Sequence, residues 1–378
     1  MPASPASSKT PAVWPWLDRL RTRVTRRSRR TGTQEPRRHD PLANIDKPRW
    51  IAGALLGGAV AVWIVGNMVA SPSAFTFLLF VGITNGAIYA LIALGFTLSY
   101  SSIGLINLPH GYVFMTGAVL SGHLLGTVGV DESSSFGRNL PAMLIVLLIV
   151  MSACGFLSAV IEIVAYRPLS NAPRLSRLVT SIGVLFILNN IIVAWTGSKP
   201  VALPDLLPRG DVFSVMGVAY TWDKLIVLLS MALALASLYF ALRRTRFGRS
   251  IRAAIQDSEG AQLVGVNVAR TVTLAFFLAG VLAGAGGQLY ALYFTNVSWD
   301  HALRLTLIAF TAVVLGGIES LIGAVIGAMI IGITESFVNG FEWYSPGSDW
   351  TESVVLSVLI ILLVLRPQGL LGEDSGRP

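Results

Sequence analysis

Residues 75–99, FTFLLFVGITNGAIYALIALGFTLS, form an uncharged and mainly apolar run. A helix needs about 20 such residues to cross the hydrocarbon core of a bilayer, so this run predicts a transmembrane helix. The whole chain of 378 residues has the same character, because 53% of its residues are hydrophobic and only 13% are charged. Soluble domains carry about 25% charged residues. The sequence therefore predicts an all-α polytopic membrane protein.

Ten segments are candidates for membrane spans. Six of them are clearly apolar: 50–69, 75–99, 141–165, 222–242, 271–292 and 352–365. Four are shorter or interrupted by glycine and polar residues: 109–126, 178–195, 304–316 and 321–338. We expect about ten transmembrane helices, or eight if the short segments only re-enter the membrane.

The positive charges predict the orientation of these spans. Residues 1–49 hold 12 Lys and Arg against 4 Asp and Glu. With this tail in the cytoplasm and ten spans, 23 Lys and Arg fall on the cytoplasmic side and 5 on the other side. This asymmetry follows the positive-inside rule. We expect a membrane domain at 50–372, a short tail at 373–378, and both termini in the cytoplasm.

The basic tail contains RLRTRVTRRSRR at Arg19–Arg30 and has no apolar core of the kind found in a secretory signal peptide. Its composition is typical of a disordered cytoplasmic segment that contacts anionic lipid. A nucleic-acid-binding arm is the alternative. Nothing aromatic accompanies the arginines, so we expect the lipid bilayer as a partner and no nucleic acid.

Polar side chains within the spans are costly and are candidates for a translocation pathway. The candidates are Asn85, Tyr89, Asn107, His110 and Glu335. Pro109 predicts a break in the helix just before His110. For His110 a purely structural role is the alternative, and no second histidine nearby suggests a metal site.

Two further carboxylates have simpler interpretations. Glu162 lies near the end of a span and five residues before Arg167, which predicts a local ion pair. Glu319 follows a double glycine in a short turn that we place on the cytoplasmic side. Small residues such as Gly323 and Gly327 recur at four-residue spacing, which predicts close helix packing within the membrane.

The chain lacks the motifs of several enzyme classes. It contains no G-x-x-x-x-G-K-[ST] phosphate-binding loop and no H-E-x-x-H zinc motif. Cys154 is its single cysteine, so it has no disulfide framework and no cysteine-based metal site. We expect a protein that is not an enzyme and that binds no cofactor itself.

A charged stretch, RFGRSIRAAIQDSEGAQLVGVN, occupies Arg246–Asn267 between two apolar spans. Its apolar residues recur at partly helical spacing, which predicts an amphipathic cytoplasmic helix over 249–265. Such a helix either lies on lipid or docks on another protein. Its many alanines and glycines favour a protein partner.

This stretch resembles the cytoplasmic coupling loop of ABC-importer permeases, and more narrowly that of the branched-chain amino-acid (high-affinity Leu/Ile/Val) importers. We refer to residues 243–270 as the coupling loop. The resemblance implies that the following residues contact a partner ATPase: Gly248, Arg249, Arg252, Ala253, Asp257, Ala261 and Gly265. The blocks NGAIYALIALGFTLSYSSIGLINLPHG, AYRPLSNAPRLSRLVTSIGVLFILNN and RPQGLLG resemble the family as well. One departure is NLPHG, where the family more often has Phe-Ala before the histidine.

The resemblance implies a function and a set of partners. It implies a permease subunit in the bacterial inner membrane that carries branched-chain or hydrophobic amino acids. A second permease subunit, two ATPase subunits that hold ATP and Mg, and an extracytoplasmic binding protein would complete the importer. The same architecture carrying urea or a short amide is one alternative. A stand-alone secondary transporter is another, and a membrane anchor without transport is a third.

Overall fold

A computed structural model describes residues 47–130, 134–170, 172–197, 199–341, 347–366 and 368–371. The chain divides into two compact units, Met1–Gly57 and Gly58–Pro378. Most of the predicted basic tail and the whole of 373–378 lie outside the described residues, so both stay predictions. The first unit contributes the beginning of one helix, and the rest of the description concerns the second unit.

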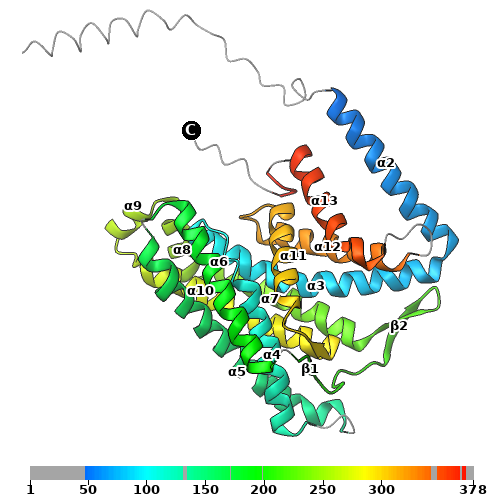
Figure 1. Cartoon of the computed structure of the whole chain (residues 1–378), viewed down its shortest axis with the longest axis horizontal. Helices are drawn as coiled ribbons and strands as arrows, with labels where there is room; N and C mark the ends of the chain where they lie inside the picture. The colour runs from blue at the N-terminus through cyan, green and yellow to red at the C-terminus, as the bar shows by residue number, and fades with distance from the viewer. Residues whose placement is uncertain are drawn as a thin grey trace, which may run out of the picture. The chain divides into compact units, whose positions relative to one another are not determined.

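The described chain consists mainly of long helices with short connections (Figure 1). The α-helices are α2 (Lys47–Ala70), α3 (Pro72–Ile103), α4 (His110–Val128), α5 (Phe136–Ile161), α6 (Arg174–Thr196), α7 (Trp222–Arg244), α8 (Arg246–Gln256), α9 (Ser258–Leu263), α10 (Val268–Phe294), α11 (His301–Gly316), α12 (Leu321–Gly340) and α13 (Thr351–Leu365). Three short helical turns are η1 (Glu162–Tyr166), η2 (Arg167–Leu169) and η3 (Ser348–Trp350).

Each of the ten predicted spans corresponds to a helix. Within the described ranges, seven helices are long and apolar enough to cross a membrane: Pro72–Ile103, His110–Val128, Phe136–Leu169, Leu175–Thr196, Trp222–Arg244, Val268–Phe294 and Leu321–Gly340. The helical, polytopic class is therefore confirmed, whereas the number of ten spans is not. Helix α11 has 16 residues and is shorter than a typical span.

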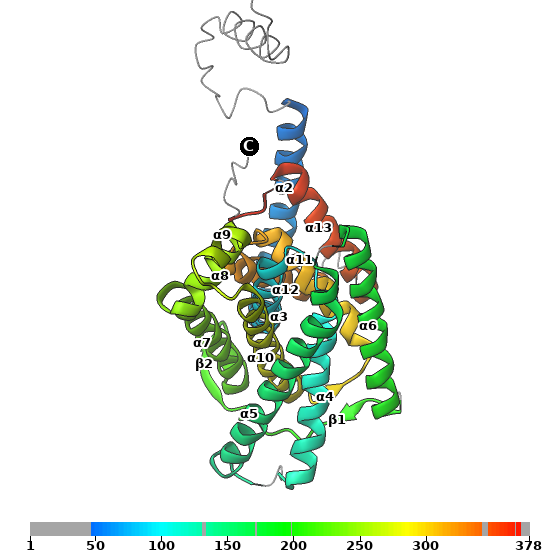
Figure 2. The ribbon, with the colours of Figure 1, turned by 90° about the vertical axis from the view of Figure 1, so that its left-hand side faces the viewer.

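Helix α3 lies at the centre of the helical unit, where it packs against α12, α10, α7 and α11 (Figures 1 and 2). In its most apolar stretch 67% of the residues are buried, compared with 17% in α7. Glycines allow the close approach of α12 to α3. A Cβ atom at Gly86 would lie 2.8 Å from the Met329 Cα, and one at Gly82 would lie 2.7 Å from the Ile333 Cα. These contacts are between backbones, as expected where lipid gives helices no hydrophobic reason to associate.

The predicted close packing at Gly323 and Gly327 is confirmed. A Cβ atom at Gly323 would overlap the Gly316 carbonyl of α11, and one at Gly327 would overlap the Ala312 carbonyl one turn earlier. The four-residue spacing places both glycines on the same face of α12. Glycine at these positions therefore fixes how closely α11 and α12 pair.

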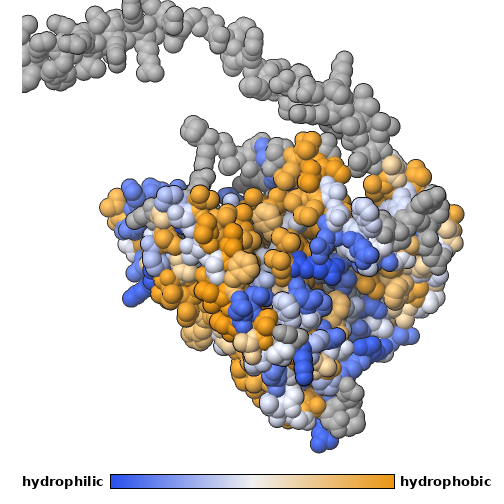
Figure 3. All heavy atoms as spheres, in the orientation of Figure 1, coloured by the Kyte–Doolittle hydropathy of each residue, from blue (hydrophilic) through white to orange (hydrophobic). Residues whose placement is uncertain are grey.

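The periphery of the unit is apolar. Large hydrophobic side chains are exposed along three helices, including Leu148 and Phe156 on α5, Phe186 on α6, and Leu233 on α7. Figure 3 shows hydrophobic side chains over much of the face that carries α5 and α6, and hydrophilic ones gathered beside α11. Broad apolar surface is what a lipid-facing helix presents.

Four short strands were not predicted. Strand β1 (Val201–Ala202) pairs with β4 (Asn296–Val297), and β2 (Asp211–Val215) forms a hairpin with β3 (Val218–Thr221). The hairpin turns at Met216 and Gly217, which both have positive φ angles of 51° and 79°. Two-residue hairpin turns favour this conformation. The strands tie together the connections that follow α6 and α10.

The predicted helix break before His110 is confirmed. Helix α3 ends at Gly104, which is in the left-handed conformation (φ 65°), and Pro109 is the N-cap of α4. Six residues separate the two helices, and the Gly104 amide makes the last helical hydrogen bond of α3, to the Tyr100 carbonyl at 2.7 Å.

Candidate functional site

A polar cavity of about 770 Å³ lies among α3, α10, α11, α12 and the start of α13. We call it the Glu335 cavity. Its lining residues come from widely separated parts of the chain: Asn85, Tyr89, Tyr290, Phe294, Asn296, His301, Arg304, Leu305, Glu335, Asn339, Ser348, Asp349 and Glu352. The volume lies within the usual range for sites that bind small molecules. Three of the five predicted pathway residues, Asn85, Tyr89 and Glu335, meet here.

An ion pair stands in the Glu335 cavity. Glu335 on α12 is 5% exposed, and its Oε1 atom pairs with the Arg304 guanidinium from the first turns of α11. The Tyr89 hydroxyl donates to the other carboxylate oxygen, Oε2, at 2.6 Å. Helix packing explains this meeting, because the glycine contacts between α3 and α12 bring Tyr89 and Glu335 together. Each oxygen of the buried carboxylate thus has its own donor.

Further polar groups surround this pair. The Arg304 Nε atom lies 3.9 Å from Glu352 Oε1 at the start of α13, and Glu352 has a largely exposed side chain. The Tyr290 hydroxyl and His301 Nδ1 are hydrogen-bonded at 2.9 Å. Asn85 Oδ1 is buried and has no hydrogen-bond partner among the described residues. The cavity therefore offers an unused acceptor next to opposite charges.

Sequence reasoning overlooked Arg304. It is one of the five Lys and Arg residues that fall on the outer side, and it is also the first residue of the predicted span 304–316. A cation at the first position of an apolar segment was the available signal. The signal was ambiguous because an arginine at a helix end also reaches out to the interface.

The other two pathway candidates lie elsewhere. Asn107 is buried, and its Oδ1 is 3.1 Å from the Tyr166 hydroxyl, which is also 3.0 Å from Ser181 Oγ. This network ties the break between α3 and α4 to η1 and α6. His110 is fully buried against Gly95 and meets Phe96 edge to face. Neither residue is among those that line the Glu335 cavity, so the structure divides the five candidates into separate groups.

The coupling loop contains two helices where the sequence predicted one. Helix α8 ends at Gln256 and α9 begins at Ser258, so the continuous helix over 249–265 is wrong. Asp257 interrupts it in an extended conformation (φ −154°, ψ 102°). Its Oδ1 atom accepts hydrogen bonds from the amides of Glu259 at 3.1 Å and Gly260 at 3.0 Å. Asp257 is thus the N-cap of α9, a role that aspartate fills well.

Several of the residues proposed to contact an ATPase already make contacts within this chain. A Cβ atom at Gly248 would overlap the Leu242 carbonyl, and Ala261 is 5% exposed. Gly265 ends α9 with a φ of 87°. Arg252 is exposed and donates to the Leu242 carbonyl. Whether any of them touches an ATPase stays a prediction, although several already have a clear role within this chain.

Two apolar side chains protrude at the end of α9. Leu263 is 89% exposed and Val264 is 78% exposed, and both lie between the charged residues Glu259 and Arg270 of the loop. Sequence reasoning did not single them out. Arg249 on α8 is exposed as well, so the coupling loop presents both charge and apolar surface. A surface of this mixed kind is typical of a contact site for another protein.

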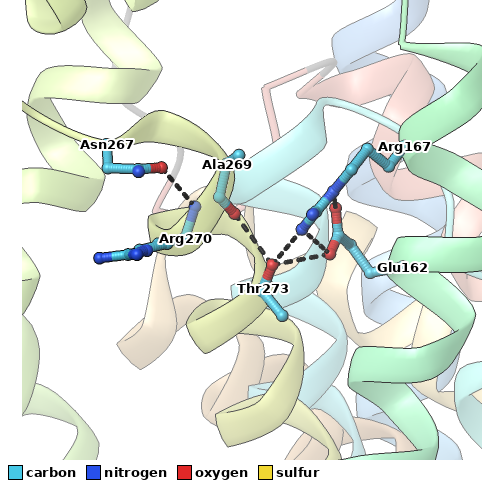
Figure 4. Close-up of polar contacts among 6 residues, drawn as sticks. All are labelled: Glu162, Arg167, Asn267, Ala269, Arg270 and Thr273. Carbon is cyan, nitrogen blue, oxygen red and sulfur yellow. Dashed lines mark hydrogen bonds and ion pairs between the residues drawn. The ribbon is translucent and has the colours of Figure 1, made fainter.

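An ion pair in the segment after α5 is hydrogen-bonded to Thr273 of α10, the helix that begins at the end of the coupling loop (Figure 4). Arg167 donates to both oxygens of the buried Glu162, with Nε to Oε1 at 3.2 Å and Nη2 to Oε2 at 2.8 Å. The predicted local pair is thereby confirmed. The Thr273 hydroxyl from the second turn of α10 donates to Glu162 Oε2 at 2.9 Å. Figure 4 shows the Arg270 side chain directed away from this group.

The start of α10 is itself fixed to the coupling loop. Asn267 caps this helix, because its Oδ1 accepts from the Arg270 amide at 3.0 Å. Only a few residues therefore separate α9 from α10, and Thr273 on α10 contacts Glu162. The described part of the chain contains no group of three or more His, Cys, Asp and Glu residues that could hold a metal ion.

Replacing Asp257 with alanine removes both hydrogen bonds at the N-terminus of α9. Loss of an N-cap costs about 1 kcal/mol, so we expect the amides of residues 258–263 to exchange roughly fivefold faster. Asparagine keeps an acceptor oxygen, and Asp257→Asn is the matched control with near-normal exchange. Hydrogen–deuterium exchange of the purified chain measures both. Equal protection in the alanine variant would contradict the capping role.

Known proteins resemble this chain over most of its length. Residues 78–364 match the family described as "Branched-chain amino acid transport system / permease component". The high-affinity branched-chain amino acid transport system permease protein BraD of Pseudomonas aeruginosa is 34% identical over 304 residues, which cover 78% of this chain and 94% of BraD. The corresponding protein LivH of Escherichia coli K12 is 32% identical over 303 residues, covering 79% of this chain and 95% of LivH.

More distant proteins match as well. The autoinducer 2 import system permease protein LsrC of Escherichia coli is 27% identical over 286 residues, covering 74% of this chain and 76% of LsrC. Among solved structures, PsaBC of Streptococcus pneumoniae in complex with Fab aligns with 15% identity and a TM-score of 0.41, covering 82% of this chain and 97% of that chain.

Proposed function

This chain belongs to the family of branched-chain amino acid transport system permease components, and from that membership we propose that it forms part of the membrane pathway of an ATP-driven importer for branched-chain amino acids. The resemblance to LsrC shows that related permeases serve systems for other small molecules. The substrate therefore needs a direct test.

The observation that carries the proposal is the exposed coupling loop together with its fixed connection to α10. A chain without a phosphate-binding loop needs an ATPase partner if ATP drives it. Leu263, Val264 and Arg249 offer that partner apolar contacts and a positive charge. In this proposal two ATPase subunits hold ATP and Mg, and this chain has no ATPase site.

Transmission from the ATPase to the membrane follows the contacts described above. A shift of α9 moves the capped start of α10, and the Thr273–Glu162–Arg167 group joins α10 to the end of α5. Helix α10 also packs against α3 and carries Tyr290 and Phe294 of the Glu335 cavity. One helix thus connects the ATPase side with the proposed pathway.

The remaining partners follow from the same proposal. A second, homologous permease subunit completes the pathway, and an extracytoplasmic binding protein delivers the substrate. The chain is placed in the bacterial inner membrane with both termini cytoplasmic. In this orientation β1–β4 and the β2–β3 hairpin lie on the outer side, toward the binding protein.

Cells that lack this chain should lose uptake of labelled leucine, isoleucine and valine, and cells that regain it should recover uptake. The reason is that ATP hydrolysis on the partners has no pathway to drive without the permease. Depleting ATP should stop this uptake, whereas a protonophore that leaves ATP intact should not. If only urea uptake were lost, the proposal that the substrates are branched-chain amino acids would be wrong. Uptake that follows the proton gradient would overturn the ATP-driven mechanism and favour a secondary transporter.

A further inference from the structure

We propose that Arg304 and Glu335 form an exchangeable ion pair that binds the α-carboxylate and the α-ammonium groups of a zwitterionic amino acid. The inference rests on the proposed function and assigns its substrate contacts. In the proposed orientation the Glu335 cavity lies toward the outer side, because most of its residues come from the ends of α10 and α12 and the starts of α11 and α13, which face that side.

The charges of the cavity are arranged for such an exchange. The Glu335 side chain is 6% exposed, whereas that of Arg304 is 38% exposed and therefore reachable. Tyr89 holds Glu335 Oε2, so the other oxygen, Oε1, is the one that Arg304 contacts. A ligand ammonium group at Oε1 would replace one donor and leave the Tyr89 bond intact.

Arg304 has a second anchor on its other side. Its Nε atom lies 3.9 Å from Glu352, which can hold the guanidinium after Glu335 has been released. The guanidinium then offers its remaining N–H groups to a ligand carboxylate, with the paired geometry that arginine forms with carboxylates. Both new contacts are charge-assisted, like the ones they replace.

The exchange selects for a ligand that carries both charges. Releasing Arg304 without a replacement leaves the buried Glu335 carboxylate, whose side chain is 6% exposed, without its charged partner, which is unfavourable. A zwitterion supplies the cation for Glu335 and the anion for Arg304 at once. A ligand with one charge, or a neutral molecule such as urea, leaves at least one of them unpaired.

The rest of the lining suits the remainder of an amino acid. Tyr290, Phe294 and Leu305 supply apolar contacts for an aliphatic side chain. Asn85 Oδ1, buried and without a partner among the described residues, is a free acceptor for the ammonium group.

Binding to the wild-type importer tests this without any substitution. The complete permease–ATPase complex would be placed in nanodiscs, without nucleotide or binding protein, and titrated with tritiated leucine. Competitors are 3-methylbutylamine, which lacks the carboxylate, 4-methylpentanoate, which lacks the ammonium, and urea. We expect each to compete at least tenfold more weakly than unlabelled leucine. Equal competition by the amine or the acid, or no saturable leucine binding at millimolar concentration, would overturn the proposal.

A double substitution tests whether the Arg304–Glu335 pair binds the amino acid or only holds α11 and α12 together. R304Q/E335Q replaces the ion pair with two neutral groups that still hydrogen-bond, so the link between α11 and α12 is kept. We expect its leucine affinity to fall at least tenfold and its preference for leucine over urea to disappear, with little change in unfolding temperature. Asp205→Asn disrupts the exposed Asp205–Arg209 pair and is the matched control. Unchanged leucine affinity in R304Q/E335Q would overturn the site.

The same complex, placed in sealed proteoliposomes with ATP and the binding protein, distinguishes the two levels of inference. If the wild-type importer takes up leucine with ATP but shows no preference for the zwitterion, the proposed function stands and this site is wrong. If it takes up no leucine under those conditions, both the proposed function and the proposed amino-acid site at Arg304 and Glu335 are wrong.

Discussion

Replacing Gly332 with leucine is expected to prevent the chain from folding into a stable membrane protein. A Cβ atom at this position would overlap the backbone of Gly86 and the Gly82 carbonyl of α3. Overpacking a core commonly costs about 1–3 kcal/mol, and more where the neighbours are backbone atoms that cannot turn aside. Here all the nearest atoms are backbone atoms, so α12 would have to move away from the central helix.

The movement would also separate Glu335 from Tyr89, because both helices carry the Glu335 cavity. Size-exclusion profiles of a fluorescent fusion in mild detergent measure the result, and we expect the single peak of the wild type to be lost. Gly183→Leu is the matched control. Gly183 also lies within a helix, α6, but nothing lies within 4 Å of its Cβ position. A monodisperse Gly332→Leu protein would contradict the close packing of α12 on α3.

Replacing both Leu263 and Val264 with serine is expected to uncouple ATP hydrolysis from uptake, with at least a tenfold loss of leucine transport. These side chains are 89% and 78% exposed, so they contribute little to the fold of this chain. Burying a side chain of this kind against a partner stabilises the contact by about 1.5–3 kcal/mol. Their loss should weaken docking of the ATPase subunits. Copurification of the ATPase and binding-protein-stimulated ATP hydrolysis measure the effect.

Gln262→Ser is the control for this double variant, because Gln262 lies on the same short helix and is exposed but polar. We expect it to keep transport and ATPase binding. Normal copurification of the ATPase with the double variant would show that α9 does not dock there. In that case an interfacial helix resting on lipid would be the better account.

Several features of the site could be predicted because they depend on neighbours in the sequence. The Glu162–Arg167 pair joins residues one turn apart in the chain, and proline and glycine marked the break before His110. Asp257 was within reach too, since an aspartate followed closely by Glu259 and Gly260 is typical of a helix start. The partly helical spacing of the apolar residues around it predicted one helix, and that pattern outweighed the cap.

The Glu335 cavity could not be predicted from neighbours in the sequence. Tyr89 and Glu335 are 246 positions apart, and Arg304 lies on a third helix. Tyr89 and Glu335 were candidates only as single polar residues within apolar spans, and the sequence did not show that they meet each other or Arg304. Thr273 had no signal at all, because a threonine near a helix start has many ordinary roles.

The sequence by itself determined the membrane class, the positions of the long apolar helices and the family. These follow from local apolar runs and from ordered motifs, and the bilayer forces any such run to satisfy its own backbone as a helix. Tertiary structure alone decided which polar residues share a cavity and which surfaces stay free for partners. The physical reason is that backbone contacts at Gly82, Gly86 and Gly332 set how α12 lies on α3. That packing, which no local pattern encodes, pairs Glu335 with both Tyr89 and Arg304.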